Sequence, residues 1–494
     1  MHIPASDLWS SVKPNKRNLT LDEAGIETLT AVWSDGLSSR FNADYKAWLE
    51  SGQMNASFLR DGNVYFNTSL KIGKGAAAEV FLGIMPSDGR EVAVKMFALN
   101  EFSDRHFNQE RSSMKEHSAI PGILQYINSF EQRVEEADTG REMFRKVVIL
   151  ELMEGSLAEA VSNWKILGCA GKPSHLHAIQ FVSASLLHTL SRLNYGAKKD
   201  LVHRDVKPDN IMIDHLGYIR LGDFGISKVL EKVQEYSSAS SGGPEAFASP
   251  EALEDNVRAH RTSDLFSVGM VMLAMMLLRP GGDGIPRGTE ALYRTVANQV
   301  PSQWPQWQTC AFQALLRALL EPKPRRRAYN ELLLSGMTPH RIVMAHPFYW
   351  TAQTGLRFLV TLGNYKEAPF ANVLLSKVRQ AIQEALVNDE RTWFDVVMDL
   401  EQSGIHATDD RLKGQPFGLL KFIRNKCIHL NSGMPWSLRQ KLLNQRIFQE
   451  RFPSLVTLCW EALLNVIKEI NGHMQHAQLR EFFDRPVEVE SFRK

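Results

Sequence analysis

Hydrophobic and polar positions alternate in strand-length segments between residues 64 and 95, and a short buried apolar run follows at 147–152. Alternation of this kind predicts β-strands with one buried face. The helical pattern Phe107–His117 lies between the two stretches. This part of the chain is therefore expected to form a small sheet with one helix. The predicted strands are 64–66, 70–72, 80–83, 91–95 and 147–152.

Helical patterns dominate after Gly155. The apolar run Leu265–Leu278 is too short to span a bilayer, so we predict a buried core helix there. A second helical segment begins at Trp350 and contains the amphipathic runs Ala371–Leu386 and Phe452–Ile470. No Gly/Ser-rich linker precedes this segment, so we expect a small helical domain docked rigidly on the preceding part.

The composition is that of a globular protein of two or three domains, with 494 residues, 44% of them hydrophobic and 23% charged. The 57 basic and 55 acidic residues leave a net charge of only +2, so a nucleic-acid site would have to be local. The four cysteines form no CxxC pair, which argues against a disulfide framework and a zinc site. The first residues lack the pattern of a secretory signal. We therefore expect a soluble, cytoplasmic chain without a membrane span.

A basic, proline-rich stretch, Glu321–Arg327, lies between two helical patterns. Such a stretch can bind RNA or act as a nuclear signal. It can also be a solvated structural loop, which is the more usual role of a run of charges. The pattern alone does not separate the two interpretations.

The motif HRDVKPDN at 203–210 and the motif DFG at 223–225 point to phosphoryl transfer. That reaction needs a carboxylate at the attacking hydroxyl, and oxygen ligands for the metal ions that neutralise the phosphates. Asp205 is the predicted base. Asn210 and Asp223 are the predicted Mg²⁺ ligands.

The chain between these motifs is predicted to be a hairpin. The short apolar segments 211–213 and 219–221 flank the turn residues Leu216-Gly217. Such a hairpin would bring Asn210 and Asp223 together.

The spacing of these motifs, followed by Pro250-Glu251, matches the signature of protein kinases. Lys207, two residues after Asp205, is the form usual in serine/threonine kinases. Asp264 resembles the structural aspartate of the kinase large lobe. The sequence therefore predicts a serine/threonine protein kinase that uses ATP or ADP with Mg²⁺.

A glycine-rich turn between two predicted strands provides the phosphate site. Gly73 and Gly75 let backbone amides approach phosphate oxygens, while Ala78 stands at the third glycine position of the kinase pattern. Lys95 is predicted to hold the α- and β-phosphates and to pair with Glu110, with Glu116 as the second choice. The predicted nucleotide-binding residues are Ile72, Gly73, Gly75, Val80, Ala93, Lys95, Glu151, Met153, Asn210 and Asp223.

The segment 226–247 is rich in hydroxyl side chains. It can be a flexible, unmodified loop. It can also be a phosphorylation switch that is ordered through Arg204. The hydroxyl residues are Tyr236, Ser237, Ser238, Ser240 and Ser241.

The end of the kinase part narrows the family. His346–Trp350, the sequence HPFYW, runs directly into the helical segment, which contains Trp393-Phe394-Asp395 and Arg424–His429. Together with Leu150–Leu157, these motifs resemble the inositol-requiring kinase/endoribonucleases of the unfolded-protein response and their relative ribonuclease L. The resemblance covers about 64–483. It implies an α+β fold class, in which a bilobal kinase is followed by an all-α ribonuclease domain called KEN.

The resemblance also implies domain boundaries, which we give as expectations. The small lobe is expected at 64–154 and the large lobe at 155–347. The predicted N-terminal extension is 1–63, the KEN domain is 348–484, and the tail is 485–494.

Metal-independent RNA cleavage needs a base, an acid and a cation for the phosphate. The resemblance implies that Arg424 holds the scissile phosphate, Asn425 positions it, and His429 is the acid, leaving a 2′,3′-cyclic phosphate. The family has a catalytic tyrosine thirteen residues before the arginine, where this chain has Arg411. His406 could replace it as the base.

These features predict a bifunctional enzyme. Nucleotide binding and autophosphorylation would promote self-association as a homodimer or larger oligomer, which would assemble the RNA-cleaving site for stress signalling. The alternative is an active kinase whose KEN domain is a catalytically dead dimerisation module. The chain would then be a soluble relative, or the cytosolic part, of an endoplasmic-reticulum membrane sensor.

Overall fold

The chain forms two compact units in the computed structural model. The first contains Met1–Cys169 and His188–Gly284, and the second contains Ala170–Leu187 and Ile285–Lys494. The residues that the structure describes are 58–61, 64–75, 77–85, 91–135, 142–166, 168–196, 201–214, 217–224, 228–229, 244–253, 260–332, 337–364, 371–386, 393, 418–429, 447–470 and 477–484.

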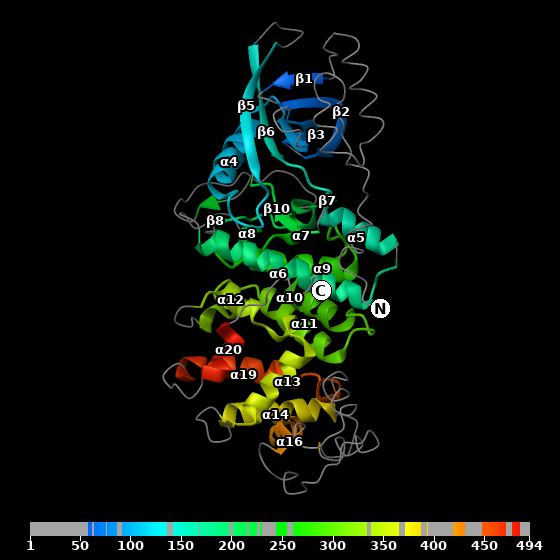
Figure 1. Ribbon diagram of the computed structural model, residues 1–494, viewed down its shortest axis with the longest axis vertical. Coiled ribbons are helices and arrows are strands. Elements are labelled where there is room, and N and C mark those ends of the chain that lie inside the picture. The colour runs from blue at the N-terminus through cyan, green and yellow to red at the C-terminus, as the bar shows by residue number, and fades with distance from the viewer. Residues whose placement is uncertain are drawn as a thin grey trace. The chain divides into compact units, whose positions relative to one another are not determined.

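A six-stranded antiparallel sheet dominates the first part of the first unit (Figure 1). Its strand order is β1-β2-β3-β4-β6-β5, and helix α4 (Glu101–His117) packs against β4, β5 and β6. The predicted small sheet with one helix is confirmed. The strands are β1 (Phe58–Asp61), β2 (Val64–Lys74), β3 (Ala78–Ile84), β4 (Glu91–Phe97), β5 (Tyr126–Glu135) and β6 (Glu142–Glu151).

The rest of the first unit is mainly helical, with short strands near the predicted motifs. The predicted hairpin is confirmed, because β9 (Ile211–Ile213) pairs antiparallel with β10 (Ile219–Leu221). The predicted core helix is also confirmed as α9 (Ser263–Leu277), which is almost entirely buried. The other elements are β7 (Gly155–Ser156), α5 (Leu157–Ile166), the end of α6 (Pro173–Tyr195), β8 (Leu201–Val202), η2 (Pro208–Asn210), β11 (Lys228–Val229), α7 (Pro244–Phe247) and α8 (Pro250–Leu253).

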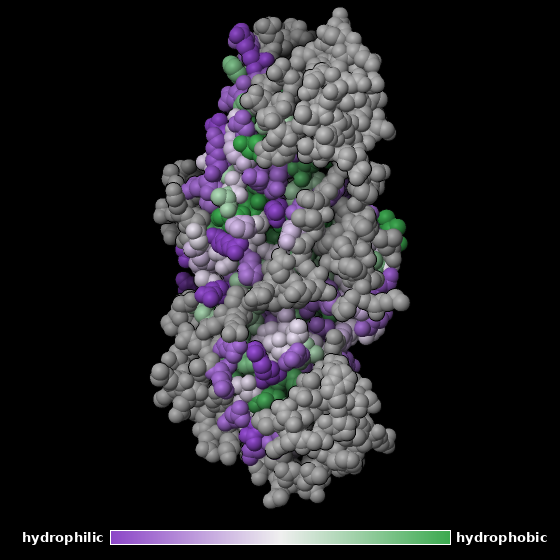
Figure 2. Space-filling model, viewed as in Figure 1, coloured by the Kyte–Doolittle hydropathy of each residue, from purple (hydrophilic) through white to green (hydrophobic). Residues whose placement is uncertain are grey.

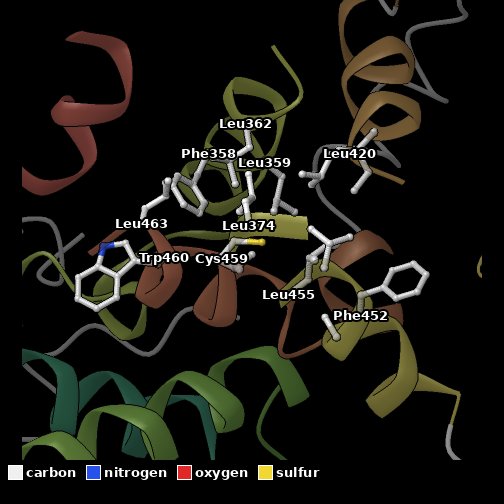
Figure 3. Close-up of a cluster of buried hydrophobic side chains, with 14 of the residues drawn as sticks. Phe358, Leu359, Leu362, Leu374, Leu420, Phe452, Leu455, Cys459, Trp460 and Leu463 are labelled. Carbon is white, nitrogen blue, oxygen red and sulfur yellow. The ribbon is translucent and has the colours of Figure 1, made fainter. Parts of the chain in front are cut away.

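The second unit is helical. Its apolar core gathers side chains from helices far apart in the chain, such as Phe358, Leu374 and Trp460 (Figure 3). The amphipathic runs predicted in this part correspond to α14 and α19. The elements are the start of α6, then α10 (Thr289–Asn298), α11 (Gln306–Leu319), η3 (Arg327–Leu332), α12 (Pro339–Met344), η4 (Pro347–Tyr349), α13 (Ala352–Leu362), α14 (Ala371–Ala385), α16 (Gly418–His429), α18 (Ile447–Arg451), α19 (Leu455–Ile470) and α20 (Ala477–Asp484).

The HPFYW sequence is buried inside this helical core. Gln180 of α6 donates a 2.6 Å hydrogen bond to the Phe348 carbonyl, and the Tyr349 hydroxyl donates to Ser183 Oγ at 3.1 Å. The His346 ring meets the Trp460 ring edge-on at 4.9 Å. The segment before the junction and the helices after it therefore share one core, in agreement with the absence of a flexible linker.

Burial of two histidines around this junction makes stability depend on pH. Burial lowers the pKa of His340 and of His346 from 6.5 to about 3. As the pH falls, the two histidines therefore bind protons in the unfolded chain before they do so in the folded chain. The contribution of the neutral histidines to stability is complete above about pH 6.5 and is lost as the pH falls toward 3. We expect the free energy of unfolding to fall by about 1.4 kcal/mol per pH unit for each histidine in that window.

Urea unfolding measured between pH 7 and pH 4 checks this dependence. His346→Asn is the useful variant, because the asparagine oxygen can still accept the 3.1 Å hydrogen bond from the Phe348 N–H. The variant should lose stability less steeply than the natural chain as the pH falls. Equal slopes for both chains would contradict the assignment to His346.

Exposed large hydrophobic side chains are scattered over the described surface. They include Phe102 and Phe144 in the first unit and Val373 in the second. Figure 2 shows mixed purple, white and green patches on the described part of one face. Within the ranges that the structure describes, no helix has the length and apolar character needed to cross a membrane.

Candidate active site

Lys95 on β4 and Glu110 on α4 form a buried ion pair. Lys95 Nζ lies 2.8 Å and 2.7 Å from the two carboxylate oxygens of Glu110, and 3.5 Å from Asp223 Oδ1. The inward face of α4 explains the choice of partner, because Phe107, Glu110 and Met114 are buried at helical spacing. Glu116, the second choice from the sequence, is exposed.

The charges around Lys95 keep it protonated. Burial disfavours the ammonium, but the Asp223 and Glu110 carboxylates outweigh that effect and raise the pKa of Lys95 above its ordinary value. A fixed cation in this position can hold phosphate oxygens.

Replacing Glu110 by glutamine is expected to lower phosphoryl transfer by about ten-fold or more. The change leaves Lys95 without the carboxylate that orients it, and a charged hydrogen bond of this kind contributes about 1.5–3 kcal/mol. Steady-state kinase assays with varied ATP check this effect. Glu116→Gln is the matched control on the same helix and should stay within two-fold of the natural chain, so equal losses in both variants would contradict the pairing.

The catalytic loop places two predicted residues, Lys207 and Asn210, around the carboxylate of Asp205. Lys207 Nζ lies 2.9 Å and 2.7 Å from the two oxygens of Asp205. Asn210 Nδ2 donates to the Asp205 carbonyl at 2.9 Å and to Asp205 Oδ2 at 2.8 Å. Since the amide nitrogen of Asn210 faces Asp205, its Oδ1 atom is the one that can ligate a cation.

Asp264 on α9 holds the start of this loop. Its carboxylate is fully buried and accepts from the His203 N–H at 2.9 Å and the Arg204 N–H at 2.8 Å. Asn194 Nδ2 adds a longer contact of 3.4 Å. Arg204 has a left-handed backbone with φ of 70°, which a residue with a side chain adopts at a cost. The scaffold role expected for Asp264 has this geometric basis.

His203 links the catalytic loop to the DFG motif. Its Nδ1 atom accepts from the Asp205 N–H at 3.3 Å, while Nε2 lies 3.1 Å from the Gly222 carbonyl. Its ring also meets the Phe224 ring edge-on at 4.6 Å. Burial lowers the pKa of His203, which agrees with a neutral ring that accepts at one nitrogen and donates at the other.

The hairpin places Asp223 next to the catalytic loop. The Gly222 N–H donates to the Asn210 carbonyl at 2.9 Å, directly before Asp223. Asp223 has φ of 60°, and its side chain is about 45% exposed. The Asp223 carboxylate and the Asn210 amide oxygen are hard donors, so the residues present fit Mg²⁺.

The predicted nucleotide residues lie along the sheet beside this site. Strand pairing sets Gly73, Val80 and Lys95 in one row across β2, β3 and β4. The Gly75 N–H donates to the Ala78 carbonyl at 2.8 Å, which closes the glycine-rich turn. The remaining predicted residues are Ile72 on β2 (half-buried), Ala93 on β4 and Met153 after β6 (both buried), and Glu151 (half-buried), whose carboxylate accepts from the Gln125 N–H at 2.8 Å.

A second group of predicted residues lies on α16 in the second unit. Arg424 donates from Nε and Nη2 to Asn425 Oδ1 at 3.1 Å and 2.8 Å, and from Nη1 to Asn364 Oδ1 at 3.4 Å. Two amide oxygens therefore hold the guanidinium. The backbone of His429 lies on the same helix, but its side chain, like Arg411 and His406, lies outside what the structure describes.

Asn364 and Gly363 are the residues of this group that the sequence did not predict. A Cβ atom at Gly363 would lie 2.9 Å from both Arg424 Cβ and the Leu420 carbonyl, so α16 approaches the end of α13 closely because glycine stands there. The sequence feature that could have indicated these two residues is Leu-Gly-Asn at the end of an amphipathic helix. Its partner lies sixty residues further along the chain, and no local pattern connects them.

The comparison with known proteins gives the same family as the motifs, the protein kinases. Residues 66–337 match the protein kinase domain family. The serine/threonine-protein kinase Nek1 of Mus musculus is 24% identical over 282 residues, 55% of this chain and 21% of that protein. It is a relative of the kinase part.

Two relatives extend over both units. The serine/threonine-protein kinase/endoribonuclease IRE2 of Homo sapiens is 27% identical over 425 residues, 83% of this chain and 42% of that protein. The serine/threonine-protein kinase/endoribonuclease IRE1 of Hypocrea jecorina is 25% identical over 475 residues, 84% of this chain and 35% of that protein. The resemblance stated from the motifs is confirmed, although the chain spans less than half of each relative. Since the kinase domain match alone covers more than half of its residues, the chain belongs to the protein kinase family.

Proposed function

We propose that this kinase is a bifunctional enzyme, a serine/threonine protein kinase and a metal-independent endoribonuclease. The observation that carries the second activity is the Arg424 guanidinium, held on α16 by the Asn425 and Asn364 oxygens. It supports the proposal together with the two relatives described as kinase/endoribonucleases.

In the kinase reaction, Asp205 accepts the proton of the attacking hydroxyl. Lys207, 2.7 Å from Asp205, neutralises charge on the transferred phosphoryl group, and Lys95 holds the α- and β-phosphates. Asn210 and Asp223 would hold Mg²⁺, which would offset the negative charge of the phosphates. Substrates are ATP and a serine or threonine hydroxyl of another protein or of the chain itself.

In the RNA reaction, Arg424 binds the scissile phosphate. The 2′-hydroxyl loses its proton to a base and attacks phosphorus, while His429 donates a proton to the leaving 5′-oxygen. The products are a 2′,3′-cyclic phosphate and a 5′-hydroxyl. His406 is the proposed base, since Arg411 stands where the related family has a tyrosine.

Nucleotide binding and autophosphorylation of 226–247 are proposed to favour a homodimer or larger oligomer. Self-association then completes the RNA-cleaving site, and the enzyme acts in stress signalling at the cytosolic side of the endoplasmic reticulum. Sedimentation with and without ADP tests this step, and an unchanged mass would count against it.

The nuclease assignment is tested with a labelled stem-loop RNA, nucleotide and the full chain. Loss of the phosphate cation in Arg424→Ala should lower cleavage by about 10²–10³-fold, as removal of a transition-state donor does. Arg379→Ala removes an exposed arginine from α14 in the same unit and should change little. Intact RNA with the natural chain, at concentrations where it self-associates, would reject the nuclease activity.

The second candidate function is an active kinase whose helical domain only dimerises. Arg411, in place of the expected tyrosine, favours it. Nucleotide-dependent dimerisation with no cleavage of any stem-loop RNA is the result that would select this function.

A further inference from the structure

The stretch between α11 and η3 is a turn held by internal hydrogen bonds. Arg327 is fully buried and donates from Nε to the Glu321 carbonyl at 2.9 Å and from Nη2 to the Pro322 carbonyl at 3.0 Å. The N–H groups of Arg326 and Arg327 both donate to the Lys323 carbonyl, at 2.9 Å and 3.0 Å. One arginine of the basic run is therefore an internal anchor for the others.

Lys323, Arg325 and Arg326 remain exposed on this turn, which we call the basic turn. The nearest carboxylate in sequence, Glu321, accepts from the Lys323 backbone N–H at 3.2 Å. Within the described ranges, no carboxylate forms an ion pair with the side chains of Lys323 or Arg325. These two cations are therefore presented to solvent with their charge uncompensated.

The basic turn is tied to the helical core of the second unit. Helix α11, which ends just before it, packs against α18 and α19. Tyr329, two residues after Arg327, donates from its hydroxyl to Glu461 Oε1 of α19 at 3.2 Å. Its ring also meets the Trp460 ring edge-on at 5.6 Å. The turn thus belongs to the same compact unit as α16, which carries Arg424.

We propose that the basic turn binds the phosphate backbone of the RNA substrate, away from the bond that is cut. The inference rests on the proposed ribonuclease activity and adds the surface that holds the substrate. Because the net charge of the whole chain is only +2, long-range attraction contributes little, and RNA affinity has to come from a local cluster of cations.

The composition of the surrounding surface favours RNA over a membrane. A helix or turn that binds a lipid surface normally inserts large apolar side chains beside its cations. Of the exposed large hydrophobic residues in the described ranges, only Val373 belongs to the second unit. Guanidinium groups on a hydrogen-bonded turn suit phosphates at fixed spacing.

The test uses the full chain and a fluorescent stem-loop RNA made entirely of 2′-O-methyl nucleotides, which cannot be cleaved. The variant Lys323→Ser/Arg325→Ser/Arg326→Ser should bind this RNA about ten-fold more weakly. The slope of log K against log salt should fall by about 2, since each lost single-strand phosphate contact removes about 0.7. With cleavable RNA, KM should rise while kcat stays the same.

The matched control, Arg294→Ser/Arg341→Ser/Arg379→Ser, removes three exposed cations from the same unit and gives the same net charge. It should keep the natural affinity and slope. Equal losses in both triple variants would overturn the proposal, and so would full competition by polyglutamate of equal charge, which would indicate an acidic protein partner. Unchanged autophosphorylation shows that a variant is folded.

The two proposals fail in different ways. If the natural chain neither binds nor cleaves RNA, the ribonuclease activity is rejected and the basic turn with it. If the natural chain cleaves RNA but the basic-turn variant binds it normally, only the role of the basic turn is rejected.

Discussion

Replacing Asp205 by asparagine is expected to lower the rate of phosphoryl transfer by about 10²–10⁴-fold, the usual contribution of a positioned general base. Asparagine has the same shape and can keep the 2.8 Å contact with Asn210 Nδ2 through its oxygen. It cannot accept the hydroxyl proton, and it leaves the Lys207 ammonium, now 2.7 Å from a carboxylate oxygen, without its counter-charge. The loss should therefore appear mainly in kcat, with a smaller change in the KM for ATP.

Incorporation of labelled γ-phosphate into the chain, at saturating ATP and Mg²⁺, measures this effect. Asp209→Asn is the matched control, because Asp209 has the same charge and is exposed on the short helix η2, four residues after Asp205. That variant should keep most of the activity. Retention of more than about a tenth of the natural rate by Asp205→Asn would contradict the base assignment.

Replacing Asp264 by alanine is expected to lower the free energy of unfolding by about 3–5 kcal/mol. The change leaves the N–H groups of His203 and Arg204 without their acceptor inside the protein, and each unsatisfied buried donor costs about 1–3 kcal/mol. The left-handed backbone of Arg204 also loses the contact that holds it. The catalytic loop should therefore lose its conformation before the rest of the first unit unfolds.

Urea denaturation followed by circular dichroism, together with hydrogen exchange of residues 201–214, measures both effects. Asp264→Asn keeps one acceptor oxygen and should lose about half as much stability. The exposed Asp283→Ala should change stability by less than about 0.5 kcal/mol. If Asp264→Ala were no more destabilising than Asp283→Ala, the carboxylate could not be the anchor of the loop.

Local pattern was enough to predict the parts of the kinase site that lie close in the chain. The β9–β10 hairpin follows from two short apolar segments around Leu216-Gly217, and it joins Asn210 to Asp223 as expected. The choice between Glu110 and Glu116 also follows from helical periodicity, because only Glu110 lies on the buried face with Phe107. The structure therefore brings together the predicted kinase residues, while their individual roles stay predictions.

The features that the sequence did not predict depend on distant contacts or on mixed patterns. The residues of β5 are largely polar, so this edge strand shows little of the alternation that a half-buried strand normally has. Asn364 and Gly363 act on Arg424 across sixty residues. In the sequence, Arg327 looks like one more surface charge in a basic run. Only the fold shows that its side chain is buried and donates hydrogen bonds to the carbonyls of Glu321 and Pro322.

The shared core around His346 limits how the kinase could be separated from the proposed ribonuclease. The match to the kinase domain ends at residue 337, yet Ser183 and Gln180 of α6 depend for packing on Tyr349 and Phe348. A chain cut after 337 would uncover that face of α6 and should aggregate rather than yield a free kinase. The proposed ribonuclease activity is therefore better removed by a point substitution such as Arg424→Ala, which leaves this packing intact, than by deleting the helical domain.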